Sequence, residues 1–172
     1  MIASKSKSKK KTIYIGADHA GFDAKSSIID YLKTKNYLVK DLGGNSASDP
    51  DDYPDFGYLV GSNVAKNKNS IGIAICGTGV GICIATNKVK SIRAALVYNT
   101  KLADLAIRHD NANVLCLGAR VTPLEEMFEI IDIFLSSKFE KGRHLRRINK
   151  ISKIENNTYG KKTKFKKILH HD

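Results

Sequence analysis

Short apolar runs alternate with longer amphipathic segments along most of the chain. The run IGIAIC at 71–76 has no polar position, which is typical of a strand buried on both faces of a parallel sheet. Residues 122–137 predict a helix, with Thr122 as N-cap, Pro123 in the first turn and Glu125 completing a capping box. By the same criteria the chain is predicted to form strands at 12–16, 37–42, 71–76, 92–97 and 113–117, and helices at 22–35, 56–66, 100–109, 122–137 and 142–154, with a short helix after a glycine-rich turn.

Alternation of strands and helices predicts an α/β fold, a Rossmann-like three-layer αβα sandwich around a five-stranded parallel sheet. In such sheets, ligands bind outside the carboxyl ends of the strands. Polar or glycine-rich segments adjoin three of the predicted strands: 16–21 (GADHAG), 76–81 (CGTGVG), and the pair 109–111 (HDN) and 118–120 (GAR) around the fifth strand. We therefore expect all of them to meet at one edge of the sheet.

The net charge of +12 is unevenly distributed. Residues 1–11 contribute +5 and residues 156–172 contribute +4, which leaves +3 for the whole of 12–155. We therefore expect a basic N-terminal extension (1–11), one globular domain (12–155) and a basic C-terminal tail (156–172). The lysines of 5–11 are either a localisation address or part of a solubilising extension. No apolar run is long enough to span a bilayer, so we expect no membrane partner.

Three cysteines without a secretory signal indicate free thiols in a reducing compartment, which predicts a cytoplasmic protein. Cys83 and Cys116 lie in apolar segments and are expected to be core residues. Cys76 is different, because it ends a buried strand directly before GTGVG. A thiol at this position is favoured as a thiolate, and the loop N–H groups can hold a phosphate or a developing oxyanion. The alternative is that Cys76 only packs and that the glycines bind a nucleotide.

This loop is not a standard nucleotide motif. The third residue after Gly79 is Ile82, so the spacing of the dinucleotide fingerprint is absent, and no Gly-Lys-Ser/Thr follows as in a Walker loop. Taken alone, His109 is either a helix cap or an acid–base group. The basic run 143–147 is either a phosphate site or a solvated helix face. The sequence by itself leaves these alternatives open.

Five motifs occur in order: GADHAG (16–21), DYPD (52–55), ICGTGVG (75–81), HDNANVLCLGAR (109–120) and GRHLRR (142–147). Together they resemble the ribose-5-phosphate isomerase B family, within the wider ribose/galactose sugar-phosphate isomerases, over about residues 12–155. The resemblance implies interconversion of D-ribose 5-phosphate and D-ribulose 5-phosphate, a step of the non-oxidative pentose phosphate pathway, without metal or organic cofactor.

The resemblance also assigns roles. Cys76 would be the base that moves a proton between C2 and C1 through an enediolate, and backbone amides of the loop Gly77, Gly79, Val80 and Gly81 would stabilise the enediolate oxygen. His109, assisted by Thr78, would open the furanose ring. Substrate-binding positions would be Asp18, His19, Tyr53, Arg120, Arg143, His144 and Arg147. Asp110 stands where many relatives have asparagine, and an ionised carboxylate cannot donate as an amide does.

Members of the family form homodimers or tetramers with shared active sites, which we expect here too, without knowing which residues cross between subunits. One alternative substrate is a six-carbon sugar phosphate, either allose or galactose 6-phosphate. An alternative of another class is a nucleic-acid or anion-binding module that uses the basic tails. It predicts salt-sensitive RNA binding that is lost when both tails are removed.

Overall fold

Five parallel strands form one sheet in the computed structural model, which describes residues 11–159. The strand order is β2-β1-β3-β5-β4. The remaining residues of the predicted basic extensions, 1–10 and 160–172, lie outside the described residues. The strands are β1 (Thr12–Ala17), β2 (Leu38–Asp41), β3 (Ser70–Cys76), β4 (Ala94–Leu96) and β5 (Val114–Gly118).

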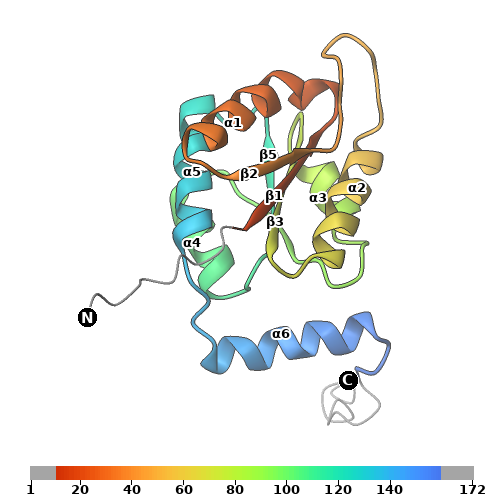
Figure 1. Ribbon diagram of the computed structural model, residues 1–172. Coiled ribbons are helices and arrows are strands. Elements are labelled where there is room, and N and C mark those ends of the chain that lie inside the picture. The colour runs from red at the N-terminus through yellow and green to blue at the C-terminus, as the bar shows by residue number, and fades with distance from the viewer. Residues whose placement is uncertain (1–10, 160–172) are drawn as a thin grey trace, which may run out of the picture.

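Helices cover both faces of the sheet (Figure 1). One face packs against α1 (Phe22–Thr34), which follows the short 3-10 helix η1 (His19–Gly21), and against α4 (Thr100–Arg108) and α5 (Leu124–Ser136). The other face packs against α2 (Tyr53–Lys66) and α3 (Val80–Thr86). The predicted three-layer αβα sandwich with a five-stranded parallel sheet is therefore confirmed.

The central strand β3 is buried along its whole length, as its uniformly apolar sequence predicts. Its side chains alternate between the two layers. Ile71, Ile73 and Ile75 join the larger core under α1, α4 and α5, whereas Ala74 and Cys76 face the smaller core under α2 and α3. Cys76 is the last residue of this strand, so its thiol lies at the carboxyl edge of the sheet and faces α3.

The carboxyl edge contains a topological switch point between β1 and β3. From β1 the chain crosses through α1 to β2 on one side, and then returns through α2 to β3 on the other. Open α/β sheets bind ligands at this kind of crevice. Because Ala17 pairs with Ile75, the residues that follow them, Asp18 and Cys76, leave the sheet side by side.

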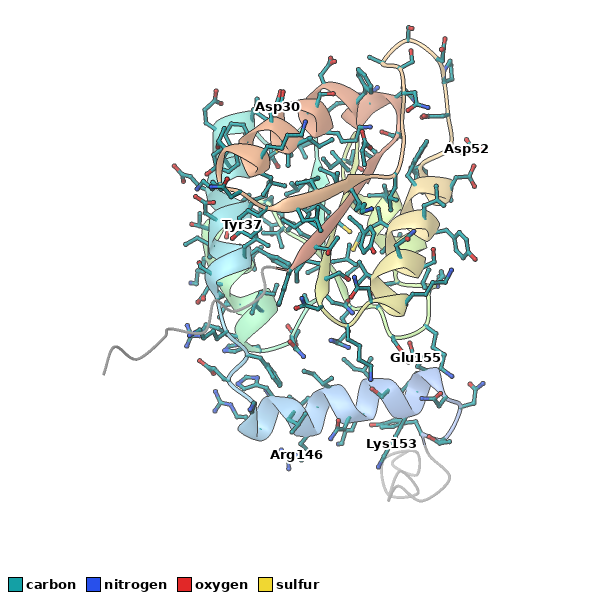
Figure 2. All side chains as sticks on the ribbon, viewed as in Figure 1. Asp30, Tyr37, Asp52, Arg146, Lys153 and Glu155 are labelled. Atoms are coloured by element: carbon teal, nitrogen blue, oxygen red, sulfur yellow. The ribbon has the colours of Figure 1, made fainter. Side chains whose placement is uncertain are left out.

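The last helix, α6 (Gly142–Glu155), lies outside the layers, beyond the amino ends of the strands (Figure 1). His144 and Ile148 are buried, with 4% and 7% of their surface exposed, and Glu155 accepts a hydrogen bond from the Ser91 N–H. In contrast, Arg146 and Lys153 point away from the rest of the chain (Figure 2). None of the helices within 11–159 is long and apolar enough to cross a membrane.

Most element boundaries differ from the prediction by one or two residues, and two of the differences have a clear structural reason. The helix expected from residue 56 begins at Tyr53, because Pro54 occupies the first turn and favours helix initiation. The strand expected at 92–97 is reduced to Ala94–Leu96, because this edge strand pairs with β5 only over those three residues.

The predicted capping box at Thr122 is wrong. Pro123 takes the N-cap position with an extended ψ of 147°, no side chain caps α5, and the helix starts at Leu124. The Thr122 N–H donates to the Gly118 carbonyl, so this residue belongs to the turn after β5. Its hydroxyl is the one buried side-chain polar atom without a hydrogen-bond partner among the residues that the structure describes.

Candidate active site

The loop after β3 places the Cys76 thiol under a backbone amide. Cys76 is 4% exposed, and the Gly79 N–H donates to its Sγ at 3.1 Å. Gly79 has φ +79°, a left-handed conformation that glycine adopts without strain, and it forms the N-cap of α3. The loop thus fixes the Cys76 sulfur at the carboxyl end of β3, in contact with a backbone N–H.

Two neighbouring side chains, Arg120 and Tyr53, pack closely against this loop. A Cβ added at Gly77 would meet Arg120 Cδ at 3.3 Å, and one at Gly81 would meet the Tyr53 ring at 2.7 Å. The Arg120 N–H also donates to the Gly77 carbonyl at 2.8 Å. Arg120 from the β5 side and Tyr53 from α2 thus flank the thiol loop. Thr78 and Val80 are exposed on its outer side.

Asp18 and His19 complete this group at the end of β1. Asp18 is 6% exposed and accepts a hydrogen bond from the Gly21 N–H at 3.0 Å. Burial raises its pKa above the ordinary value, and the Gly21 N–H opposes this shift. Asp51, in the loop before α2, accepts from the His19 N–H at 2.6 Å and lies 3.0 Å from the His19 ring Nδ1. Asp51 therefore orients His19.

We call these residues the thiol site: Asp18, His19, Tyr53, Cys76, Thr78, Arg120 and the loop Gly77–Gly81.

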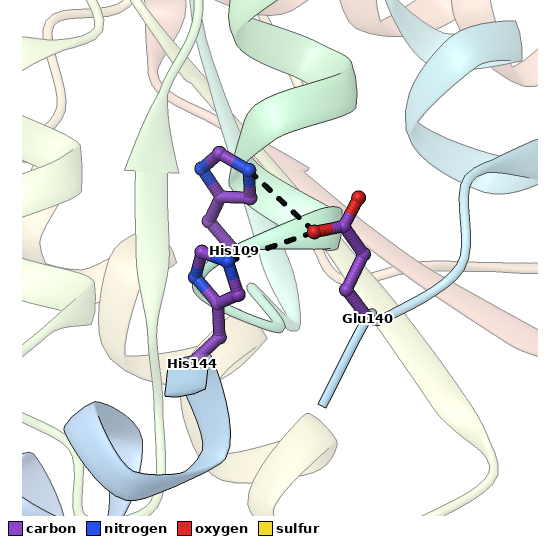
Figure 3. Close-up of side chains that lie close together, drawn as sticks. All are labelled: His109, Glu140 and His144. Carbon is purple, nitrogen blue, oxygen red and sulfur yellow. Dashed lines mark ion pairs between the residues drawn. The ribbon is translucent and has the colours of Figure 1, made fainter. Parts of the chain in front are cut away.

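A second group of predicted site residues gathers around a carboxylate (Figure 3). His109, at the carboxyl end of α4, and His144, in the first turn of α6, stack with ring centroids 4.2 Å apart and planes inclined by 15°. Glu140 Oε2 lies 3.8 Å from His109 Nε2 and 3.5 Å from His144 Nε2. Two further α6 side chains, Arg143 and Arg147, are exposed nearby. We call His109, Glu140, Arg143, His144 and Arg147 the histidine cluster.

Arg108 and burial determine the charge state of the cluster. Hydrogen bonds from Arg108 lower the pKa of Glu140, burial opposes this shift, and the positive charge of Arg108 lowers the pKa further. Burial lowers the pKa of His144, and the charges of His109, Arg143 and Arg147 lower it further. At neutral pH, Glu140 is therefore ionised and His144 is neutral.

The two groups lie at opposite ends of the sheet within one chain, so the expectation of a single edge is wrong for His109, Asp110 and Asn111. Arg143, His144 and Arg147, for which the sequence predicted no edge, lie at the same end as His109. The physical reason is chain direction. His109 and Asp110 precede β5 and lie at its amino end, whereas Arg120 follows it. The five residues of β5 alone separate these ends by about 15 Å. The exposed Asp110 is held through its carbonyl, which accepts from Arg93 Nε at 3.1 Å.

Among the described residues, one group of three potential metal ligands is close enough to share an ion. It consists of His109, Glu140 and His144, whose ligand atoms lie within 4.8 Å of one another. Imidazole lone pairs lie in the ring plane, so two stacked, nearly parallel rings do not converge on one ion. Arg143 Nε also approaches His144 Nε2 at 3.3 Å. These donors do not fit a bound cation.

Two contact residues were missed by the sequence-based prediction. Asp51 is one of several acids in an irregular loop, and nothing in its spacing indicates that it reaches His19. Glu140 lies in the connection before α6, where helical periodicity does not apply. Its one signal is that it stands four residues before His144, the spacing of neighbours on a helix.

The chain is similar to known proteins over most of its length. The family model described as Ribose/Galactose Isomerase matches residues 13–151. The chain belongs to the ribose/galactose isomerase family. The family match covers the thiol site and the histidine cluster together, and it stops before the basic C-terminal residues.

Individual members of the ribose/galactose isomerase family are similar over nearly their full length. A probable ribose-5-phosphate isomerase B of Mycoplasma genitalium is 52% identical over 147 residues, which cover 85% of this chain and 97% of the relative. The crystal structure of ribose-5-phosphate isomerase B from that organism, with bound ribulose 5-phosphate, superposes with a TM-score of 0.83, covering 86% of this chain and 97% of that one. The Clostridium thermocellum enzyme gives a TM-score of 0.83 at 44% identity, covering 85% and 98%.

Proposed function

We propose that the protein is an aldose–ketose isomerase that interconverts D-ribose 5-phosphate and D-ribulose 5-phosphate. The observation that carries this function is the Cys76 thiol, held under the Gly79 N–H beside Asp18 at the switch point of the sheet. Relatives named ribose-5-phosphate isomerase B are similar over 85–86% of this chain, and one of them was solved with ribulose 5-phosphate bound.

The thiol site suits proton transfer between adjacent carbons. The Cys76 thiolate removes the proton from C2 of the open-chain aldose, and the electron pair of that C–H bond forms the C1=C2 bond of an enediolate whose charge lies on O1. The hydroxyl proton of O2 then passes to O1 as the C2=O2 bond forms, and the Cys76 thiol returns its proton to C1. The remaining N–H groups of the Gly77–Gly81 loop stabilise the negative charge that develops on the substrate oxygen. Asp18 contacts the hydroxyls near the reacting carbons, and Tyr53 lines the site.

Arg120 is the one permanently charged cation of the thiol site, and several cationic groups together bind a phosphate more strongly than one does. Arg143 and Arg147 supply such charge, but at the other end of the sheet. We therefore propose a homodimer, alone or paired into a tetramer, in which the thiol site of one subunit meets the histidine cluster of the partner. His109, assisted by Thr78, then opens the sugar ring, and His144 lines the site.

Exposed apolar side chains support this assembly. Tyr58, Leu59 and Ile84 project from α2 and α3 on the side of the thiol loop, each with 38–62% of its surface exposed. Leu145, Ile151 and Ile154 are similarly exposed on α6. Burying two such patches against a second copy provides the hydrophobic contact that a stable homodimer needs.

Mixing two inactive variants tests the shared site. Cys76→Ala is expected to abolish isomerisation while phosphate-ligand binding persists, and His109→Ala is expected to abolish catalysed ring opening. After subunit exchange in an equal mixture, about half of the dimers contain one intact site, so about a quarter of wild-type activity returns. Substantial turnover by Cys76→Ala would refute its role as base, and a mixture that stays inactive would refute the shared site.

The substrate preference and the boundaries of the catalytic domain are tested by separate experiments. Kinetics on five-carbon and six-carbon sugar phosphates, measured side by side, distinguish ribose 5-phosphate from the allose or galactose 6-phosphate alternatives. We infer that 12–155 is the catalytic domain, that the flanking basic segments are accessory, and that the free thiols belong to a cytoplasmic protein. A 12–155 chain should isomerise at the full rate, and a large loss would assign the segments a catalytic role.

A further inference from the structure

Glu140 is the one carboxylate of the histidine cluster, and the proposed function gives it no task. Its Oε2 faces both imidazoles, at 3.8 Å from His109 Nε2 and 3.5 Å from His144 Nε2. We propose that Glu140 is the positioning residue for ring opening: it orients His109 and stabilises the imidazolium that forms there. This inference rests on the proposed function, because it concerns the step that precedes proton transfer at Cys76.

The chemistry of ring opening creates a transient positive charge. The His109 imidazole takes the proton of the C1 hydroxyl, the C1–O4 bond breaks as the C1=O1 bond forms, and the same proton passes to O4. His109 is therefore an imidazolium between the two transfers. A carboxylate facing one ring nitrogen stabilises that cation and holds the ring in one orientation.

The geometry fits this division of the two ring nitrogens. Figure 3 shows His109 Nε2 directed at Glu140, whereas Nδ1 points away from the carboxylate and is left for the substrate. A separation of 3.8 Å is an ion-pair distance. An approach of about 0.6–1 Å would make it a hydrogen bond, and catalytic hydrogen bonds commonly tighten when the substrate binds.

Arg108 keeps Glu140 ionised and in place. Its Nε donates to Glu140 Oε1 at 2.8 Å, and its carbonyl accepts from the Glu140 N–H at 3.1 Å. Arg108 is itself fixed by Asp104, whose Oδ2 lies 2.8 Å from Nη1, and Asp104 accepts a second hydrogen bond from Ser137. Glu140 thus presents one oxygen to an arginine and the other to the imidazoles, so its negative charge is directed at His109.

The remaining charged groups around His109 are compatible with this role. His144 stacks on the ring, and its lowered pKa keeps it neutral, so it restrains the ring plane without adding a positive charge. Arg143 and Arg147 do add positive charge on the α6 side, and Asp104 adds a negative charge from α4. Glu140 is the carboxylate with an oxygen closest to His109 among the described residues, which makes it the group that offsets these arginines.

Ribulose 5-phosphate separates the two chemical steps. Its C5 oxygen carries the phosphate, so the ketose cannot close a five-membered ring and remains open-chain. Exchange of its C1 proton with deuterated water therefore requires the Cys76 base but no ring opening. Turnover of ribose 5-phosphate, which is mainly a furanose, requires both steps.

Glu140→Gln, Glu140→Asp and the control Glu155→Gln test the proposal at saturating substrate. Glu155 also ties α6 to the body, through the Ser91 N–H at 2.5 Å, but it does not face His109. We expect Glu140→Gln to lower kcat for ribose 5-phosphate about 10- to 100-fold, with C1 exchange in ribulose 5-phosphate changed by less than about twofold. Glu140→Asp should recover part of the loss, and Glu155→Gln should leave both rates near wild type.

Three outcomes would overturn the proposal. The first is unchanged turnover in Glu140→Gln. The second is a parallel loss of turnover and exchange, which indicates that Glu140 only supports the fold of α6. The third is an equal selective loss in Glu155→Gln. Retained exchange shows that a variant is folded, and a wild-type protein that catalyses neither reaction would instead refute the proposed function.

Discussion

Replacing Gly79 by alanine tests whether the thiol loop depends on close packing as well as on backbone freedom. Gly79 has φ +79°, and its N–H donates to Cys76 Sγ. A Cβ at this position would lie 2.6 Å from Leu96 Cδ1, 2.9 Å from the Leu117 carbonyl carbon and 3.0 Å from the Gly118 nitrogen. The leucine side chain can rotate, but the β5 backbone cannot move away, so the loop must shift.

The expected cost has two parts. A left-handed backbone costs a residue with a Cβ about 1–2 kcal/mol relative to glycine. Contact with the β5 backbone adds about 1–3 kcal/mol, which is typical of overpacking. We therefore expect Gly79→Ala to lower the free energy of unfolding by about 2–5 kcal/mol. A loop displacement near 1 Å at the reacting thiol should also lower kcat about 100-fold.

Gly142→Ala is the matched control. Gly142 also has a left-handed conformation, with φ +52°, but no atom lies within 4 Å of its added Cβ. It should lose only the backbone part, about 1–2 kcal/mol. Urea denaturation of both variants measures the difference, and initial rates with ribose 5-phosphate measure activity. Equal losses of stability in the two variants, or a wild-type kcat in Gly79→Ala, would refute the packing argument.

Three further predictions concern stability. The Lys25 side chain is 2% exposed and donates to the buried Gly44 carbonyl at 2.7 Å. Lys25→Met should therefore lower the free energy of unfolding, measured by denaturation, by about 2–4 kcal/mol. The control Lys33→Met, at an exposed position, should leave it almost unchanged. Thr122→Val removes the unpartnered hydroxyl and should stabilise the protein by about 1 kcal/mol, which a lower melting temperature would contradict. Arg108→Ala should destabilise the protein at neutral pH. Arg108 lowers the pKa values of two carboxyls from 3.8 and 4.5, so its contribution is complete above these values and is lost as pH falls through the lowered ones. The deficit of the variant should therefore shrink steadily as pH falls below about 4 in denaturation curves, and a deficit that stays constant over this range would contradict this origin.

Much of the fold was predictable because the pattern of apolar and polar residues along the chain matches the burial of their side chains in the structure. The apolar run of β3 is stable only when helices cover both of its faces, and its prediction as a strand buried on both faces of a parallel sheet is confirmed. Errors arose where tertiary contacts override a local signal. Thr122 has the residue type of an N-cap, but its N–H is held by the Gly118 carbonyl in the turn after β5, which leaves the hydroxyl away from the helix.

The chemistry of the site was also predictable at the level of motifs. The position of Cys76 before GTGVG indicated a thiol at the start of a helix, and in the structure the Gly79 N–H, at the N-cap of α3, donates to its Sγ. The partners of the two site histidines were not predictable. Asp51 reaches His19 across 32 residues of sequence, and Glu140 approaches His109 from a loop that has no periodicity. Neither distance is encoded in local spacing.

By itself, then, the sequence determined the layers of this protein, the family it resembles and the residue types of its chemistry, because these depend on local periodicity and on short motifs. Only the tertiary structure decided that Cys76 and His109 lie at opposite ends of one sheet. Strand direction imposes that separation, since residues before and after a parallel strand leave from different edges. For this reason one chain presents two separate groups of site residues, which is the basis for the shared site that we propose.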